Sequence, residues 1–92
     1  MTQVMKGLRV LELAQWTFVP AATAILADCG AAVIKIEHPI HGDAQRANRR
    51  LFGRDVDPKR PILMQHANRG KRNVGIDART PEGLALVYRL AA

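Results

Sequence analysis

The residues best suited to chemistry are cations gathered in the second half of the chain. Ten of the fourteen Lys and Arg residues fall between positions 46 and 79, with three aspartates to offset them there. Within this block, the segment NRGKRNVGIDARTPEG (residues 68–83) places cations around a short apolar run, directly before a helix-like segment. Such a block suits an anionic partner, and nucleic acid, a nucleotide or a phosphorylated cofactor all qualify. A solvated surface loop explains the charge equally well.

The common signatures of nucleotide, catalytic and metal sites are missing from the sequence. The segment AQWTFVP (residues 14–20), which follows the first strand-like run, has no G-x-G-x-x-G pattern. Neither a P-loop nor a serine-centred nucleophile elbow occurs. His38, His41 and His66 are too scattered for a metal site by spacing, so we expect no metal. The cations and the strand-end loops remain as the candidate ligand-binding features.

Two short apolar runs on either side of a helical segment predict a parallel βαβ unit. Leu8–Ala14 is a short apolar run, as expected of a largely buried strand, and Ala31–Glu37 adds β-branched bulk in Val33, Ile34 and Ile36. Between them, Pro20 suits the first turn of an alanine-rich helix, and Gly30 suits its C-terminal stop. A strand, a ten-residue helix and a strand in this order favour a right-handed crossover.

One more strand and one more helix are predicted in the second half. His38–Pro39 ends the second strand because proline cannot donate to a ladder, and residues 40–69 then lose periodicity, apart from a helical turn that Asp43 could cap. A third strand is expected at Arg72–Ala78. Thr80 and Pro81 then suit the start of a helix. The apolar face of that helix is expected to hold Leu84, Val87, Tyr88 and Ala91.

These elements predict an α/β fold, in which a partial Rossmann-like parallel sheet (βαβ) is followed by a further strand and helix. The helical pattern still continues at Ala92, so residues 1–92 look like the truncated N-terminal portion of a larger domain. The first residues do not resemble a signal peptide, and no apolar run approaches the ~20 residues of a membrane span. We therefore expect a cytoplasmic protein without a membrane partner.

Several blocks of the sequence resemble a known family in the right order. MKGLRVLELAQW, then LADCGAAVIKIEHPIHGD and NRGKRNVGIDARTPEG, are similar to the N-terminal part of the class III CoA-transferases, the CaiB/BaiF family. Formyl-CoA transferase and α-methylacyl-CoA racemase belong to this family. The resemblance implies acyl-CoA and a carboxylic acid acceptor as partners, and an interlocked homodimer. Two positions depart from the family pattern: Val19 replaces a glycine, and His38 stands where many relatives have arginine.

The resemblance also implies which residues contact coenzyme A. Members of the family hold CoA on loops that follow the first and second strands and around the third strand. In this sequence those loops correspond to Thr17, Phe18, His38, Ile76, Asp77, Ala78 and Arg79. Cations and turn N–H groups suit the CoA phosphates, and apolar side chains suit its adenine or pantetheine. Lys71 and Arg72 belong to the shared motif, and we assign them a positioning or structural role.

The nucleophile that the resemblance implies lies outside these residues. Transferases of the family use an aspartate, which forms a mixed anhydride with the acyl group, whereas racemases use a histidine and an aspartate as acid and base. None of the eight acidic residues corresponds to that aspartate. We therefore assign no catalytic residue here and expect no acyl transfer by this chain alone.

Two alternatives to a CoA transferase remain open at the level of sequence. A racemase-type enzyme shares the same motifs. A small basic nucleic-acid-binding protein is favoured by charge alone, and it is the weaker alternative, since the sequence lacks interleaved aromatic residues and a helix-turn-helix pattern.

Overall fold

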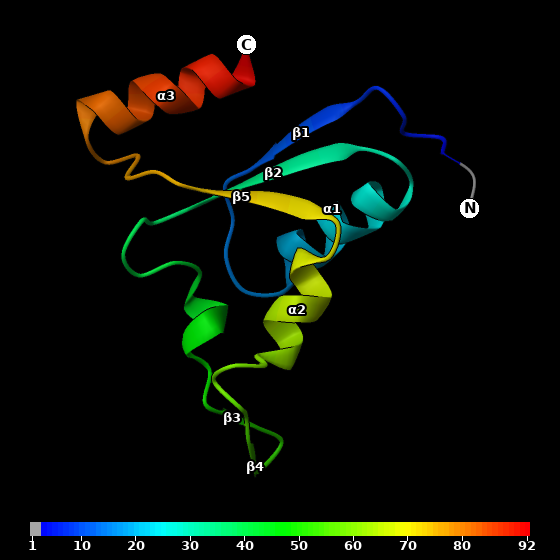
Figure 1. Ribbon diagram of the computed structural model, residues 1–92, viewed down its shortest axis with the longest axis vertical. Coiled ribbons are helices and arrows are strands. Elements are labelled where there is room, and N and C mark those ends of the chain that lie inside the picture. The colour runs from blue at the N-terminus through cyan, green and yellow to red at the C-terminus, as the bar shows by residue number, and fades with distance from the viewer. Residues whose placement is uncertain (1–2) are drawn as a thin grey trace.

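The computed structural model describes residues 3–92 and shows a mixed α/β fold built on a parallel three-stranded sheet (Figure 1). The strands β1 (Arg9–Glu12), β2 (Ala32–Glu37) and β5 (Lys71–Gly75) lie in the order β1-β2-β5. All three strands run in the same direction. Their carboxyl ends therefore meet at one edge of the sheet, where α/β proteins bind their ligands.

Helix α1 (Phe18–Asp28) connects β1 to β2 and confirms the predicted βαβ unit. The helix begins two residues before Pro20, so this proline is buried inside the first turn. Gly30 follows the helix with a φ of 104°, a left-handed conformation that glycine adopts without steric cost. The predicted stop at Gly30 is therefore confirmed, and the chain turns there to enter β2.

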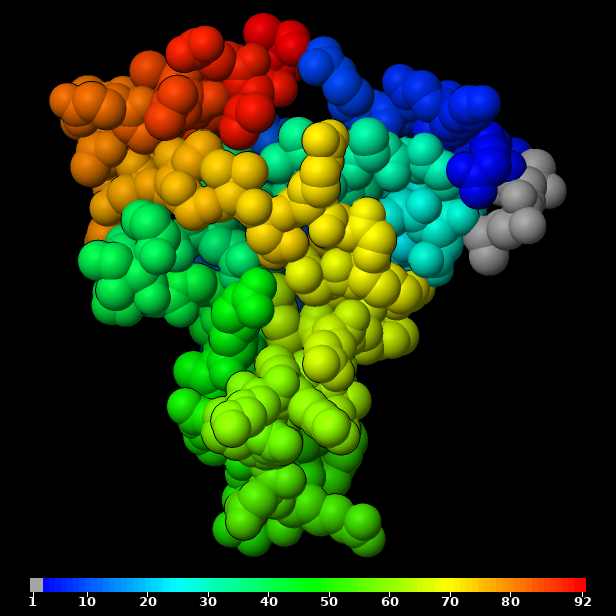
Figure 2. All heavy atoms as spheres, in the orientation of Figure 1, coloured from blue at the N-terminus to red at the C-terminus, as the bar shows by residue number. Residues whose placement is uncertain are grey.

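The segment between β2 and β5 contains more structure than its sequence predicts. Asp43 caps the 3₁₀ helix η1 (Ala44–Ala47), as expected, because its carboxylate accepts a hydrogen bond from the Gln45 N–H at 2.8 Å. Residues 50–68, which lack periodicity in the sequence, hold an antiparallel hairpin and a short helix. These elements are β3 (Arg50–Leu51), β4 (Arg54–Asp55) and α2 (Ile62–Asn68). In Figures 1 and 2 the hairpin lies at the tip of an arm that projects away from the sheet.

The two faces of the sheet are covered unequally. On one face, α1 packs against β1, β2 and α2. Side chains alternate between the faces of a strand, so Lys35 points towards α1 while Ile36 points to the opposite face. There, α3 (Pro81–Ala91) packs Val87 against Ile36 and Ile76. This second face is covered by α3 alone among the described helices, and its apolar core is small.

Helix α3 confirms its predicted start and corrects its predicted face. The Thr80 hydroxyl accepts a hydrogen bond from the Gly83 N–H at 3.0 Å, as expected of an N-cap, and Pro81 is the first helical residue. Of the expected apolar face, Val87 is buried, but Leu84 is 39% and Tyr88 is 67% exposed. The buried side of α3 is set by Gly83, Val87 and Leu90 instead, because the helix meets the sheet along that line.

Candidate functional site

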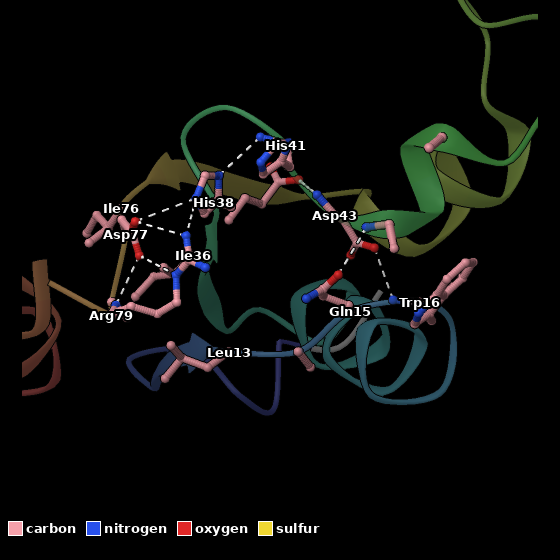
Figure 3. A pocket seen from close by; sticks show the side chains of 16 residues that line it. Leu13, Gln15, Trp16, Ile36, His38, His41, Asp43, Ile76, Asp77 and Arg79 are labelled. Atoms are coloured by element: carbon pink, nitrogen blue, oxygen red, sulfur yellow. Dashed lines mark hydrogen bonds and ion pairs between the residues drawn. The ribbon is translucent and has the colours of Figure 1, made fainter.

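A pocket of about 870 Å³ lies at the carboxyl edge of the sheet, where the loops after β1, β2 and β5 converge. The volume falls within the range of ~300–1,000 Å³ that is typical of small-molecule sites. Figure 3 shows Arg79, Asp77 and His38 at one end of the pocket and Trp16, Gln15 and Asp43 at the other. The charged side chains are partly or mostly exposed at the first end and buried at the second.

Arg79 dominates the first end of the pocket, and its side chain is 78% exposed. Its guanidinium lies 3.1 Å from Asp77 Oδ1 and 3.0 Å from His38 Nε2. The side chain of Arg79 lowers the pKa of Asp77, and Asp77 in turn raises the pKa of Arg79. An exposed cation with a single carboxylate partner can rearrange to meet an anionic ligand, because exposed ion pairs are only weakly stabilising.

The ring of His38 is oriented by the loop that follows β2. Its Nδ1 accepts hydrogen bonds from the backbone N–H groups of Ile40 and His41, both at 3.2 Å. A neutral imidazole has one acceptor nitrogen, so this arrangement assigns the proton to Nε2. The Nε2–H and the neighbouring Arg79 guanidinium are then both donors. The two nitrogens are 3.0 Å apart, so one anionic oxygen lying beside them can accept hydrogen bonds from both.

The second end of the pocket is built on a strained loop between β1 and α1. Trp16 has a φ of 70°, in the left-handed region that bulky residues rarely occupy. Its backbone N–H donates to Asp43 Oδ1 at 3.1 Å, and the Ala44 N–H donates to Gln15 Oε1 at 3.2 Å. These two bonds join the loop after β1 to the loop after β2 across the end of the pocket.

Beneath this second end lies a group of four buried charged residues, which we call the buried quartet: Glu12, Lys35, Asp43 and Lys71. Burial by itself raises the pKa of Glu12, but hydrogen bonds from Lys35, Lys71 and Thr23 outweigh it, so the pKa is lowered. Burial likewise depresses the pKa of Lys35, and its two carboxylate partners reverse that effect and raise it. Both groups are therefore held in their charged forms.

Glu37, the last residue of β2, also holds the segment after β2 in place through hydrogen bonds. Its carboxylate accepts two hydrogen bonds from Arg46, at 2.7 and 2.9 Å. It also accepts hydrogen bonds from the Asn73 side chain and from the Asp43 N–H, each at 2.9 Å. The Arg46 contacts, more than the others, lower the pKa of Glu37 to about 2. Glu37 is thus ionised and fully engaged.

The structure brings together five of the seven residues predicted to contact CoA. His38, Ile76, Asp77, Ala78 and Arg79 all line the pocket. Thr17 and Phe18 follow Trp16 into the start of α1 and lie outside the lining, and Phe18 is 92% exposed. Val19 also lies outside the lining, so the bulk that replaces the family's glycine does not narrow this pocket.

Several pocket residues escaped the sequence-based prediction. Leu13, Gln15 and Trp16 come directly after β1, His41 and Gly42 belong to the loop after β2, and Ala44 is the first residue of η1. Their common signal is position, since each follows the carboxyl end of a strand. The left-handed backbone of Trp16 and its contact with Asp43 have no local sequence signature.

Comparisons with known proteins agree with one another. The profile of CoA-transferase family III matches residues 5–92. The chain is 47% identical over 88 residues to succinate–glutarate CoA-transferase of Agrobacterium fabrum, covering 94% of this chain and 22% of that protein. It is 33% identical to succinyl-CoA:glutarate CoA-transferase of Mus musculus, covering 96% of this chain and 19% of the relative. The chain thus spans about a fifth of the length of these curated relatives.

Solved structures show the same similarity in three dimensions. A CaiB/BaiF family protein from Brucella suis superposes with a TM-score of 0.77 at 36% identity, covering 98% of this chain and 24% of that one. The orthorhombic form of Rv3272 from M. tuberculosis gives a TM-score of 0.80 at 35% identity, with the same coverage.

No helix within residues 3–92 is both long and apolar enough to cross a membrane.

Proposed function

Because the chain belongs to CoA-transferase family III, we propose that it forms part of the CoA-binding region of an enzyme that moves CoA between an acyl-CoA and a carboxylic acid. On this proposal residues 1–92 are the first portion of a larger domain. The observation that carries it is the pocket at the carboxyl edge of the sheet, which places Arg79 and His38 side by side. CoA carries a pyrophosphate and a 3′-phosphate, and charge-assisted contacts from such donors are the strong ones.

The two ends of the pocket suit different parts of CoA. The end formed by Arg79 and His38 supplies donors for a phosphate. Ile36, Ile76 and Leu13 line the space beside it and offer an apolar surface for the pantetheine arm or for adenine. The predicted contacts at Thr17 and Phe18 remain part of the proposal, since both residues directly follow Trp16 in the loop that enters α1.

The acidic residues around the pocket support a binding role for this chain and not a nucleophilic one. Asp77 is paired with Arg79, Glu37 with Arg46, and Asp43 with Lys35. A nucleophilic carboxylate must approach the thioester carbonyl with a free oxygen. We therefore assign the nucleophile, an aspartate by resemblance to the family, to a part of the enzyme outside this chain. Attack on the thioester then breaks the C–S bond, releases the CoA thiolate and leaves an acyl-aspartyl mixed anhydride. The acceptor carboxylate displaces the aspartate from the acyl carbonyl, and the thiolate then attacks the acceptor carbonyl of the new anhydride, which gives the acceptor CoA thioester and the free donor acid.

The relatives favour CoA transfer over the racemase alternative. The two curated relatives described above are named as transferases that act with succinate or succinyl-CoA and glutarate. We infer a dicarboxylate-type acyl group for the same reason. The family's interlocked homodimer is also part of the proposal, and the exposed Leu84 and Tyr88 on α3 give it an apolar surface to cover.

The proposal is tested by exchanging the charge of Arg79 in the intact protein. Arg79→Glu removes a phosphate contact and adds repulsion, so we expect the dissociation constant for CoA to rise at least ~10-fold by isothermal titration calorimetry. Lys59→Glu is the matched control, because Lys59 is an exposed cation that does not line the pocket. Equal affinity of wild type and a folded Arg79→Glu variant for CoA would overturn the assignment.

A further inference from the structure

The buried quartet is an unusual feature for so small a protein. The Lys35 ammonium lies 2.6 Å from Glu12 Oε2 and 2.7 Å from Asp43 Oδ2, and the Lys71 ammonium lies 2.6 Å from Glu12 Oε1. All four side chains are at most 1% exposed, and their formal charges cancel. Removing a charge from water costs several kcal/mol, and buried ion pairs can often be replaced by apolar residues without loss of stability. Stability alone therefore does not account for the quartet.

The quartet is bonded to the backbone of the loops that form the Trp16 end of the pocket. Besides its two carboxylate partners, the Lys35 ammonium donates to the Ala14 carbonyl at 2.8 Å. Lys35 thus donates hydrogen bonds to Glu12 and to the Ala14 carbonyl, whereas its contact with Asp43 Oδ2 is an ion pair, since that oxygen has no hydrogen-bond partner. Asp43 Oδ1 accepts hydrogen bonds from the Trp16 N–H at 3.1 Å and from the Gln45 N–H at 2.8 Å. Lys35 and Asp43 therefore contact both loops at once.

The loop held in this way carries backbone strain. A bulky residue in the left-handed region is strained and persists only where its surroundings over-determine it. Trp16 is such a residue. The bond from its N–H to Asp43 fixes it directly, and the bond from Lys35 to Ala14 fixes the residue two positions earlier. Both restraints originate in the quartet.

We propose that Glu12, Lys35 and Asp43 are positioning residues, which hold the Ala14–Trp16 loop against the Asp43–Gln45 segment so that this end of the pocket is formed before a ligand arrives. Glu12 orients Lys35, Lys35 orients Ala14 and Asp43, and Asp43 orients Trp16. A carboxylate is needed at position 43, because its two oxygens must meet one ammonium and two N–H groups together. The role in ligand binding rests on the proposed function, whereas the role in loop geometry does not.

The loop geometry is tested without any ligand by amide hydrogen exchange of the intact protein. Asp43→Ala removes the acceptor of the Trp16 N–H, so we expect exchange at that amide to accelerate at least ~10-fold relative to wild type. Amides in β2 and α1 should accelerate clearly less than the Trp16 amide, by the amount that the overall loss of stability explains. Arg69→Met is the matched control, since it breaks the Asp28–Arg69 ion pair between α1 and the end of α2, away from the pocket. Its Trp16 exchange should stay within ~2-fold of wild type.

Asp43→Asn provides a second variant that keeps the size of the side chain. The amide oxygen can still accept one hydrogen bond, but its NH₂ group cannot pair with Lys35, so the acceleration at Trp16 should be smaller than in Asp43→Ala. Unchanged exchange at Trp16 in both variants overturns the proposal. So does acceleration spread evenly over the sheet, because that is the result of a merely structural role.

CoA affinity separates this proposal from the proposed function. If wild type binds CoA, Asp43→Ala should raise the dissociation constant by ~3-fold or more, because the pocket must then be ordered on binding. An unchanged affinity for CoA in the variant contradicts the claim of pre-formation. If wild type binds no CoA, the proposed function fails, and the exchange experiment still decides whether the quartet positions Trp16.

Discussion

The two ends of the pocket use the same kinds of charged residues in opposite ways. At the Trp16 end, Lys35, Glu12 and Asp43 are at most 1% exposed and lie within 2.7 Å of one another along the chain of ion pairs. At the Arg79 end, the cation is 78% exposed and its partner Asp77 is 28% exposed. Burial, more than the identity of the residues, separates the two ends.

This difference in burial indicates that the two ends of the pocket have different roles. A buried ion cannot exchange its partner for water or ligand without leaving the partner uncompensated, so the quartet fixes backbone geometry. An exposed ion pair is screened by solvent and separates easily, so Arg79 is free to exchange Asp77 for a ligand phosphate. We therefore expect substitutions in the quartet to act first on stability, and on affinity only through the loop that the quartet holds, whereas substitutions of Arg79 and Asp77 act directly on affinity.

The largest effect on stability is expected from Lys35→Met. This change leaves the Glu12 and Asp43 carboxylates buried with too few cations, and breaking one side of a buried pair typically costs 3–5 kcal/mol, so we expect a loss of about that size in the free energy of unfolding. Urea denaturation of the intact protein measures it. Lys59→Met removes an exposed cation and should change the free energy by less than ~0.5 kcal/mol. Similar losses of unfolding free energy in Lys35→Met and Lys59→Met would contradict the distinction between buried and exposed charges.

Gly83→Ala should destabilise the segment that supports Arg79. A Cβ built at Gly83 would lie 1.9 Å from the Asp77 carbonyl oxygen, so the turn and α3 must move apart. Replacing glycine by alanine inside a helix normally stabilises by ~1 kcal/mol, whereas we expect a loss of about 2 kcal/mol from the clash. Thermal unfolding shows whether the substitution lowers or raises the stability. A raised melting temperature would contradict the close approach of α3 to Asp77.

The pH dependence of stability should reveal Glu37. Its pKa is lowered from 4.5 to about 2, so its contribution is fully present above pH 4.5 and is lost as the pH falls towards 2. Arg46 is 42% exposed, so solvent screening reduces this contribution to the order of 2 kcal/mol. The difference in free energy of unfolding between wild type and Glu37→Gln should therefore shrink across that interval. A constant difference from pH 6 to pH 2 would contradict the ion pair with Arg46.

Much of the local structure around these residues is predictable from the sequence. The helix caps at Asp43 and Thr80 and the stop at Gly30 depend on local chemistry, and the structure confirms all three. Helix α2 was missed because it has only seven residues and its N-cap residue, Pro61, makes no side-chain cap hydrogen bond. Helix α2 is stabilised by packing against α1, and a contact between segments far apart in the chain leaves no local pattern in the sequence.

The buried quartet was beyond prediction for a related reason. Glu12, Lys35, Asp43 and Lys71 are far apart in sequence, and the register of β1, β2 and β5 brings them together. In the sequence, Glu12 stands only as a single charge within the apolar run Leu8–Ala14. Lys71 was assigned a positioning or structural role, and its complete burial agrees with that role. Arg72, its neighbour, points to the other face and is exposed.

The smallest effect is expected from Asp77→Asn, and it should be a gain. The substitution frees Arg79 from its carboxylate partner and removes a negative charge beside the phosphate position, so we expect CoA to bind about 2- to 5-fold more tightly. Calorimetric titration measures the change. Asp57→Asn removes the same charge from an exposed loop outside the pocket and should alter the affinity less. Weaker binding after Asp77→Asn would show that CoA needs the Asp77 carboxylate itself, and not only the position of this residue in the pocket lining.

The central claim is that the cationic end of the pocket recognises CoA and is not a general surface for polyanions. Titration of the intact protein with CoA and with a single-stranded oligonucleotide, at about 50 mM and 200 mM salt, tests it directly, because binding to nucleic acid weakens steeply over that interval. We predict saturable CoA binding with one site per pocket at both salt concentrations, and oligonucleotide binding that is weaker and largely lost at the higher one. Tight oligonucleotide binding without saturable CoA binding would contradict the account.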